Sequence, residues 1–335
     1  MEFSHFIGID VSKLSVNICV RTKENELFYA EVENTVKELK KFVARLKKED
    51  IYGSSTLVCL ENTGSYGYNL LEVFYEKGFS LWQEHALNIK NSMRMTRGKN
   101  DEVDSSRIAE YCCRFLDKVR FWEPEREVVV ELKKLFSVRN TLAKTKKQLS
   151  VSKDCSVGYE SKKSSKIVSR HLKKVITSIE VEMKKVSICI RALIKQDESL
   201  STLQGLICSV PGVGEVVSWK LLTVTNEFKD FDNSRKFACY SGVVPFDYQS
   251  GTSVRGRSRV SNMANKDMKS LLHMSAVSIV AMKRGELYDY YERKVKEGKD
   301  KMSVINALRN KIIARVFACV KRNEKYSEVN TNTLV

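Results

Sequence analysis

The sequence predicts a mixed α/β part followed by two mainly helical parts, and three observations carry this prediction. Short apolar runs of strand length alternate with amphipathic stretches before residue 124. Residues 125–200 are rich in lysine and carry apolar residues at helical spacing. Residues 201–335 contain further helical stretches that are separated by glycine-containing turns. We therefore expect domains over residues 1–124, 125–200 and 201–335.

The first part combines five predicted strands with helices. β-branched and aromatic runs, or alternating apolar and polar residues, predict strands at residues 6–11, 16–20, 26–33, 56–60 and 79–83. Apolar residues three and four apart predict helices over residues 36–48 and from the turn after residue 61 to about residue 77. This order is typical of a mixed sheet of the ribonuclease-H type, in which the first strand is central.

Acidic residues occur at conspicuous places in this part. Asp10 interrupts the first apolar run, and Glu61 terminates the strand that begins at residue 56. A charge in such a setting is costly unless it is paired or metal-bound. Asp101 and Asp104 lie three residues apart at the start of a predicted helix after Lys99, on one face. We expect Asp10 midway along the central strand, near the end of the Glu61 strand, with this helix closing the site.

The four carboxylates predict a site for a hard divalent cation. No histidine or cysteine neighbours them, and an all-oxygen set favours magnesium, or manganese, over zinc. Two such ions can activate a nucleophile and stabilise the leaving oxygen in phosphoryl transfer. The alternative is that Asp101, Glu102 and Asp104 cap a helix and that Glu61 is a solvated strand end. This alternative is the stronger one for Asp101 and Asp104 alone, whereas Asp10 in its apolar run favours the metal site.

The second part reads as a helical hairpin. Lysine-rich stretches at about residues 125–148 and 165–194 carry apolar residues at helical spacing, and the residues between them are rich in serine, lysine and glycine. We therefore expect two long antiparallel helices with a polar tip, in the manner of a coiled coil.

The third part opens with a Pro-Gly-Val-Gly turn. Gly212 and Gly214 follow Pro211 and precede a predicted helix, so their backbone N–H groups could meet a phosphate. This turn resembles a helix-hairpin-helix element, and an ordinary glycine-capped helix junction is the alternative. Further helices are predicted over residues 228–244, 266–282 and 303–320.

A loop of small residues is predicted between two of these helices, over residues 246–259. It carries hydroxyl groups beside Arg255, Arg257 and Arg259, which suits the binding of a phosphodiester.

Ser250 is the candidate nucleophile of this loop. A serine requires a base or a metal for activation, and the acidic residues of the same or a partner subunit could supply the metal. Ser241 and Ser253 are competing hydroxyls, and all three could be ordinary loop residues. His273 lies on a later helix, where a core or surface role is favoured over a catalytic one.

Composition narrows the class of partner. The net charge of +17 predicts a polyanionic partner, and nucleic acid is the leading candidate. The sequence contains neither a run of about 20 apolar residues nor a basic amphipathic anchor, so nothing in it indicates a membrane protein. The start lacks the form of a secretory signal, so we expect a cytoplasmic protein that associates with the nucleoid when it acts. The nine cysteines form no CxxC pair, which predicts reduced core thiols.

The chain resembles the DEDD transposases of the insertion sequence 110 family over nearly its full length. Each motif alone is weak, but their order and separation together are specific. The motifs are residues 8–12, 61–66 and 99–104 in the first half, and residues 210–214, 237–245 and 249–251 in the second half.

The resemblance implies a RuvC-like domain, a coiled-coil region and a transposase domain with its catalytic serine at Ser250. It implies metal-binding acids at Asp10, Glu61, Asp101 and Asp104. It further implies a homo-oligomer, dimer or tetramer, whose active site combines both domains. A noncoding bridge RNA from the element itself would pair with donor and target DNA.

The leading hypothesis is an RNA-guided DNA recombinase in which Ser250 attacks a backbone phosphate while the four acids hold magnesium. One alternative is a junction-selective nuclease that uses metal-activated water and forms no covalent intermediate. Another is a nucleic-acid-binding scaffold without chemistry, which would show salt-dependent binding and no cleavage.

Overall fold

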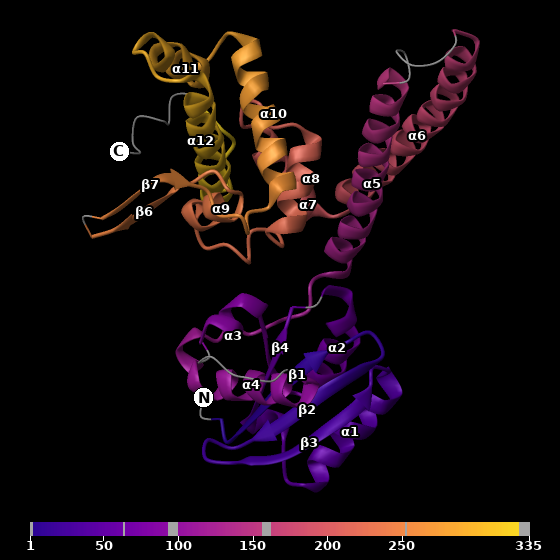
Figure 1. The fold of residues 1–335 in the computed structure, drawn as a ribbon, viewed down its shortest axis with the longest axis vertical. Coiled ribbons are helices and arrows are strands. Elements are labelled where there is room, and N and C mark those ends of the chain that lie inside the picture. The colour runs from indigo at the N-terminus through magenta and orange to yellow at the C-terminus, as the bar shows by residue number, and fades with distance from the viewer. Residues whose placement is uncertain (1–2, 63, 93–99, 156–161, 252, 328–335) are drawn as a thin grey trace. The chain divides into compact units, whose positions relative to one another are not determined.

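The fold is described from a computed structural model of the 335-residue chain. The structure describes residues 3–62, 64–92, 100–155, 162–251 and 253–327. The chain divides into two compact units, Met1–Pro124 and Glu125–Val335, and each is treated by itself below (Figure 1).

The first unit is built on a five-stranded mixed sheet with the order β3-β2-β1-β4-β5. Its strands are β1 (His5–Val11), β2 (Ser15–Arg21), β3 (Glu26–Glu33), β4 (Thr56–Glu61) and β5 (Ser80–Glu84). β2 pairs antiparallel with β1 and β3, whereas β4 pairs parallel with β1 and β5. The predicted mixed sheet with a central first strand is therefore confirmed.

Helices cover both faces of this sheet, because side chains alternate between the faces along each strand. α1 (Val36–Lys48) and α2 (Tyr68–Glu76) share a core with Ile7 and Ile9 of β1. On the other face, α4 (Asp101–Arg114) and α3 (Ala86–Ser92) share a core with Phe6. Short 3-10 turns occupy Gly53–Ser55, Gly64–Gly67 and Leu116–Lys118.

α4 crosses β1 at Gly8, where the two backbones nearly touch. A Cβ at Gly8 would lie 2.1 Å from the Ala109 nitrogen and 2.3 Å from the Ser105 carbonyl oxygen. Ser105 is fully buried in this contact, and its hydroxyl donates to the Glu102 carbonyl at 2.8 Å. Glycine at this position therefore sets how closely α4 lies on the sheet.

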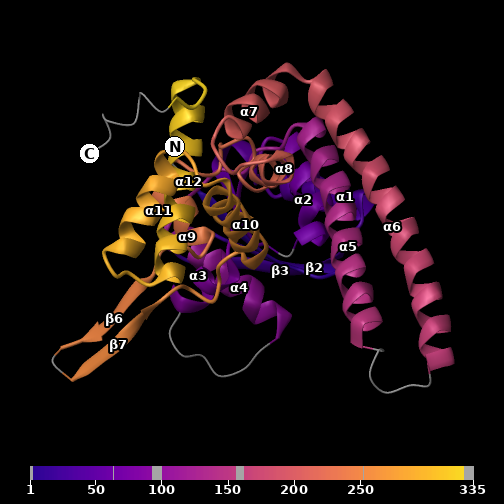
Figure 2. The ribbon, with the colours of Figure 1, turned by 90° about the horizontal axis from the view of Figure 1, so that it is seen from above.

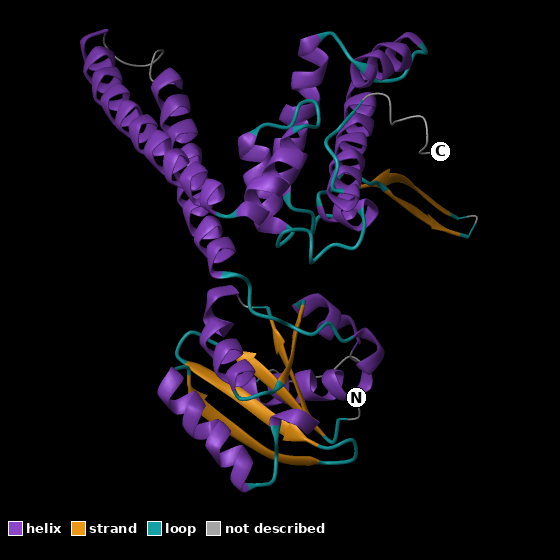
Figure 3. Ribbon diagram, turned by 180° about the vertical axis from the view of Figure 1, so that it is seen from behind, coloured by secondary structure: helices purple, strands orange, loops and turns teal. Residues whose placement is uncertain are grey.

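The second unit begins with two long helices, α5 (Glu127–Cys155) and α6 (Lys162–Gln196), which pack along each other (Figure 3). Lys146 forms an ion pair with Glu180 at 2.7 Å, and Arg139 donates to the Ser187 hydroxyl at 3.1 Å. Two long neighbouring helices were expected here, whereas the coiled-coil character stays a prediction. Residues 156–161 of the predicted polar tip lie outside the described residues.

The rest of the second unit is a helical bundle with one β-hairpin (Figure 2). Its helices are α7 (Glu198–Cys208), α8 (Glu215–Val224), α9 (Ser234–Tyr240), α10 (Lys266–Met282), α11 (Glu286–Lys296) and α12 (Lys301–Arg322). The core includes the buried side chains of Trp219, Phe237, Leu272 and Ile312. The mainly helical character of this part is confirmed, and α10 has the predicted bounds. Sequence reasoning missed α11.

Two local predictions in this unit are wrong. The helix expected over residues 228–244 is limited to α9. Residues 226–228 all have positive φ, at 48°, 56° and 67°, so no helix can begin at Phe228, and Gly242, with a φ of 64°, follows the end of α9. A right-handed helix cannot continue through such residues. The loop expected over residues 246–259 is instead a hairpin of β6 (Phe246–Ser250) and β7 (Val254–Arg259).

Two further predictions concern cysteines and membranes. The cysteines that the structure describes are all free, as expected, although Cys189 is exposed rather than in the core. Within the described ranges, no helix is long and apolar enough to cross a membrane.

Candidate functional site

The first candidate site is a row of polar residues across the face of the sheet that α4 covers. The strand register pairs Asp10 with Asn17 of β2. On the other side of β1, Ile9 pairs with Leu60 of the parallel strand β4, so the next residues of the two strands, Asp10 and Glu61, lie next to each other. These positions share the face of Phe6 and Gly8. Across the sheet, this acidic row comprises Glu31, Asn17, Asp10, Glu61 and Glu84.

Asp10 lies at the end of its strand rather than midway along it, so that part of the prediction is wrong. It is the sixth of the seven residues of β1, which ends where Ser12 turns the chain and donates to the Ser15 carbonyl at 2.8 Å. Asp10 and Glu61 are both half-buried at the carboxyl ends of adjacent parallel strands. The sheet therefore brings these two acids together, as expected.

Asp101 and Asp104 occupy the first turn of α4, on the same side of the sheet. The Asn100 side chain caps this turn by accepting the Val103 N–H at 2.7 Å. Asp104 accepts a hydrogen bond from Arg107 at 2.9 Å, so its carboxylate already has a cationic partner. Helix capping and metal binding are both compatible with this arrangement.

Tyr29 and Asn17 add a polar pair beside Asp10 that sequence reasoning missed. Asn17 is buried, and its side-chain oxygen accepts from the Tyr29 hydroxyl at 2.5 Å. Burial is the first cause of a raised pKa at Tyr29, and the charges of Glu31, Glu102 and Asp101 raise that pKa further. The hydroxyl therefore stays protonated and holds Asn17 in place.

Glu84 is a second residue that was missed, at the β5 end of the acidic row. Its carboxylate accepts from the His85 N–H at 2.7 Å, the Asn88 amide at 2.9 Å and the Tyr111 hydroxyl at 3.3 Å. Burial, and then the nearby Glu84 charge, raise the pKa of Tyr111 to about 12. Glu84 therefore ties the first turn of α3 to the end of β5 through the Asn88 side chain, and it orients Tyr111. Its position directly after the predicted fifth strand was the signal that could have found it.

The donor chemistry of this face fits a hard cation better than a soft one. Cys19 lies on the same face, but burial raises the pKa of its thiol to about 11, so it is a poor metal ligand. Carboxylate oxygens remain as the donors. Among the described residues, no group of three or more histidine, cysteine, aspartate or glutamate side chains is gathered tightly enough to hold a metal ion.

The second candidate site is the β6–β7 hairpin. Ser250 is the last residue of β6 and pairs with Val254, and Gly251 begins the turn with a φ of +55°. The side chain of Ser250 lies outside what the structure describes. The guanidinium-bearing residues of β7 are all exposed, and no ion pair within the described part of the chain involves them. They are Arg255, Arg257 and Arg259.

Ser241 and His273 fit structural roles, whereas the competing Ser253 is exposed in the hairpin turn. Ser241 is fully buried at the end of α9, so its hydroxyl is closed to a large substrate. His273 accepts a hydrogen bond from the buried Arg309 at 2.7 Å, and burial together with that charge lowers the pKa of His273. His273 is therefore held as a neutral acceptor inside the helical bundle.

The Pro211–Gly214 turn joins α7 to α8 and packs on α10. Gly212 has a φ of +80°, and a Cβ there would lie 2.7 Å from the Ser275 carbonyl oxygen. Gly214 is the cap residue of α8 and accepts the Ser218 N–H at 3.0 Å. The packing on α10 accounts for Gly212, and the phosphate contact of this turn stays a prediction.

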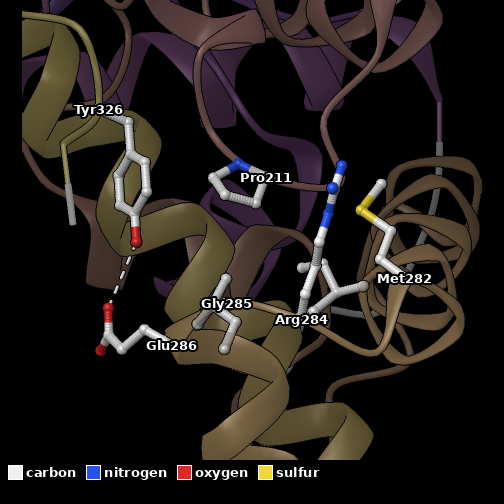
Figure 4. A pocket seen from close by; sticks show the side chains of 8 residues that line it. Pro211, Met282, Arg284, Gly285, Glu286 and Tyr326 are labelled. Atoms are coloured by element: carbon white, nitrogen blue, oxygen red, sulfur yellow. Dashed lines mark hydrogen bonds between the residues drawn. The ribbon is translucent and has the colours of Figure 1, made fainter.

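A cavity of about 430 Å³ lies beside this turn (Figure 4). Its wall includes Pro211 and Arg284, together with Tyr326, whose hydroxyl donates to Glu286 at 3.3 Å. Arg315 donates to the same carboxylate at 2.7 Å and 2.9 Å. The polar groups on this side of the cavity are therefore engaged with each other.

Comparison with known proteins gives matches in both units. A family model described as transposase of the IS116/IS110/IS902 family matches residues 204–292, and an IS110-type DEDD transposase model matches residues 7–152. The pilin gene-inverting proteins of Moraxella lacunata and Moraxella bovis are each 23% identical over 336 residues, covering 96% of this chain and 98% of theirs. The uncharacterized 43.6 kDa protein of insertion element IS110 from Streptomyces coelicolor is 24% identical over 160 residues, which are 48% of this chain and 38% of that protein.

The matches to both units and the full-length relatives place the chain in the class of DNA transposases and recombinases. The chain belongs to the IS110 family of DEDD transposases. As a member of that class, it is an enzyme that acts on DNA.

Proposed function

We propose that this transposase is an RNA-guided recombinase that cuts and rejoins DNA through a covalent Ser250–DNA intermediate. The observation that carries the proposal is the β6–β7 hairpin, which places Ser250 at the end of a strand beside three exposed arginines. Cations beside a nucleophile neutralise the phosphate that the nucleophile must approach.

The proposed reaction conserves the energy of the phosphodiester bond. The Ser250 oxygen forms a bond to phosphorus, and the bond from phosphorus to one deoxyribose oxygen breaks. The serine proton passes to a base, and the released sugar oxygen takes up a proton. A sugar hydroxyl of another strand then attacks the serine phosphodiester in the reverse sense, which joins the strands and frees the serine. The name of the gene-inverting relatives describes an outcome that such rejoining would produce.

The acidic row would serve as the metal site of the same reaction. Asp10 and Glu61 at adjacent strand ends, with Asp101 and Asp104 from the first turn of α4, would hold magnesium or manganese. Such a cation supplies Lewis-acid stabilisation of a reacting phosphate when it is bound. The role of this chain's residues is to present the oxygens, and the close contact of α4 with Gly8 keeps its first turn on that face.

Donor and target DNA are the proposed substrates, and a noncoding bridge RNA is the proposed guide. The net charge of +17 supports binding of several nucleic-acid strands at once. We further propose that the chain acts as a homo-oligomer, a dimer or a tetramer.

The test is a denaturing-gel assay for covalent protein–DNA adducts, with labelled donor and target DNA, the noncoding RNA that flanks the gene, and magnesium. We expect an adduct with the native chain and with Ser253→Ala, a matched serine in the same turn. We expect none with Ser250→Ala, and at least a hundredfold less with Asp10→Ala. Magnesium-dependent cleavage without any adduct would contradict the proposal and indicate a metal-dependent nuclease.

A further inference from the structure

The β6–β7 hairpin exposes two aromatic side chains, and the proposed chemistry of Ser250 does not use them. The side chain of Phe246 is 50% exposed and that of Tyr248 is 70% exposed. The hairpin extends from the helical bundle of its own unit in both views (Figures 1 and 2). Single exposed apolar side chains are normal, but neighbouring ones that form a patch can mark a surface for a partner.

Tyr248 is held in a defined place on this hairpin. It pairs with Gly256 of β7, and a Cβ at Gly256 would lie 2.8 Å from the Cδ1 atom of the Tyr248 ring. The ring therefore lies across the glycine, where no side chain separates it from the backbone. Such a pair stabilises a ribbon by covering a glycine, but that role needs only one face of the ring. The other face remains open to a ligand.

Arginines lie beside the same rings. A groove of about 480 Å³ is lined by Phe246, Asp247, Tyr248, Gly256, Arg257, Arg259 and Ser261. Asp247 is the one acid of this lining, and it accepts a hydrogen bond from the Ser258 hydroxyl at 2.5 Å. The volume lies within the range of about 300–1,000 Å³ that is typical of small-ligand sites. The groove thus combines aromatic rings with guanidinium groups.

We propose that this groove holds one unstacked nucleotide of a DNA strand, next to the phosphate that Ser250 attacks. Its base stacks on Tyr248 and Phe246, because every base offers a flat face that an aromatic ring can cover. Arg257 and Arg259 bind its phosphate. The inference rests on the proposed function for the place of this nucleotide along the strand. DNA is favoured over the guide RNA because the same hairpin carries the residue proposed to attack DNA.

The experiment is photocrosslinking of the full-length chain to single-stranded oligothymidylate with one 5-iodouracil, which couples to aromatic side chains stacked on it. Tryptic peptides are then analysed by mass spectrometry. We expect the crosslink at Tyr248, within the peptide of residues 237–255. Tyr248→Phe keeps the ring and should retain affinity for the strand within about twofold, whereas Tyr248→Leu should weaken it about 5- to 150-fold.

Two further variants test whether the crosslink depends on the position of the Tyr248 ring, because neither variant changes the charge of the chain. Gly256→Ala places a methyl group where the ring lies, so it should reduce the crosslink while Tyr248 remains present. Tyr52→Leu changes another exposed tyrosine, directly before the 3-10 turn Gly53–Ser55, and should leave the crosslink unchanged. Unfolding temperatures of all variants should stay close to that of the native chain, because Tyr52, Tyr248 and Gly256 are exposed.

The two proposals fail in different ways. A crosslink at Tyr248 without any covalent adduct would overturn the serine mechanism and keep the nucleotide groove. An adduct at Ser250 together with native crosslinking in Tyr248→Leu would overturn the groove and keep the mechanism. Crosslinking that occurs with the matching 5-iodouridine RNA alone would also overturn the groove as a DNA site. Ser250→Ala should crosslink as well as the native chain, since stacking requires no covalent bond to serine.

Discussion

Gly8 is the residue on which the position of the α4 acids depends most directly. A methyl group there would lie 2.1 Å from backbone atoms of α4, and backbone cannot move aside as a flexible side chain can. We expect Gly8→Ala to lower the stability of the first unit by about 3 kcal/mol, at the upper end of the usual cost of overpacking. It should also displace Asp101 and Asp104 and abolish adduct formation.

A matched glycine provides the control for that experiment. Gly205 lies inside α7, and a Cβ there would meet no atom within 4 Å. Gly205→Ala should therefore be neutral or stabilise the chain by about 0.5–1 kcal/mol. Thermal unfolding measures both variants. Equal unfolding temperatures for Gly8→Ala and the native chain would show that α4 does not depend on the close contact.

Arg126 fixes the start of α5, at the scale of a single element. It donates to Asp197, the cap residue of α7, at 2.9 Å and to Glu227 at 2.8 Å and 3.0 Å. Glu227 belongs to the left-handed turn over residues 226–228, and its side chain is 4% exposed. These hydrogen bonds of Arg126, the Arg126 clamp, therefore stabilise the strained turn over residues 226–228 together with the starts of α5 and α7.

Removal of the clamp has a predictable dependence on pH. Arg126→Gln should destabilise the second unit by about 3 kcal/mol near neutral pH, which is the lower end of the usual cost of breaking a buried ion pair. The lower end applies because Glu227 keeps a second cation, Lys229, at 3.7 Å. Hydrogen bonding to Arg126 is the first cause of the lowered pKa of Asp197. Because the pKa of Asp197 is lower in the folded than in the unfolded chain, where it is about 3.9, this carboxylate stabilises the fold at pH values above about 3.9. That stability is lost as the pH falls through the pKa of the folded chain. The difference in unfolding temperature between native and variant chains should therefore shrink from pH 6 to pH 3. A constant difference would contradict this account.

Elements whose signal is local could be predicted from the sequence, and elements set by distant contacts could not. The strands of the first sheet are apolar runs bounded by turns, so their existence and order followed from the pattern. The side chains of the β6–β7 hairpin that the structure describes are all exposed, and the many small residues of this stretch are typical of a loop. The left-handed turn over residues 226–228 contains no glycine, so nothing in its composition announced it.

The same distinction between local signals and distant contacts applies to the residues of the candidate site. Asp10, Glu61, Asp101 and Asp104 could be selected because acids at strand ends and in a first helical turn stand out locally. Glu84 follows the fifth predicted strand and offered the same local signal, whereas Asn17 could not be selected, because only the strand register aligns it with Asp10. Tyr248 was missed for a similar reason, since its place depends on the pairing with Gly256 across the hairpin.

Charge acts at the scale of the whole molecule. The chain carries 58 basic and 41 acidic residues, so DNA affinity should fall steeply with salt, by about 0.9 in the logarithmic slope for each phosphate contacted. The arginines of β7 are proposed to contact two phosphates, the one that Ser250 attacks and that of the stacked nucleotide. Replacing Arg255, Arg257 and Arg259 by glutamine should therefore lower the slope by about two.

A second triple variant removes the same charge from a different surface. Lys37, Lys47 and Lys48 are exposed on α1, which lies on the sheet face opposite the acidic row. Replacing them by glutamine lowers the net charge equally, so a purely diffuse attraction to DNA predicts the same change for both triples. A specific contact at the hairpin predicts a much smaller change for the lysine triple and no effect on its adduct yield. Fluorescence anisotropy at four or more salt concentrations measures both slopes, and equal slopes would contradict a phosphate-binding hairpin while leaving the overall charge as the source of affinity.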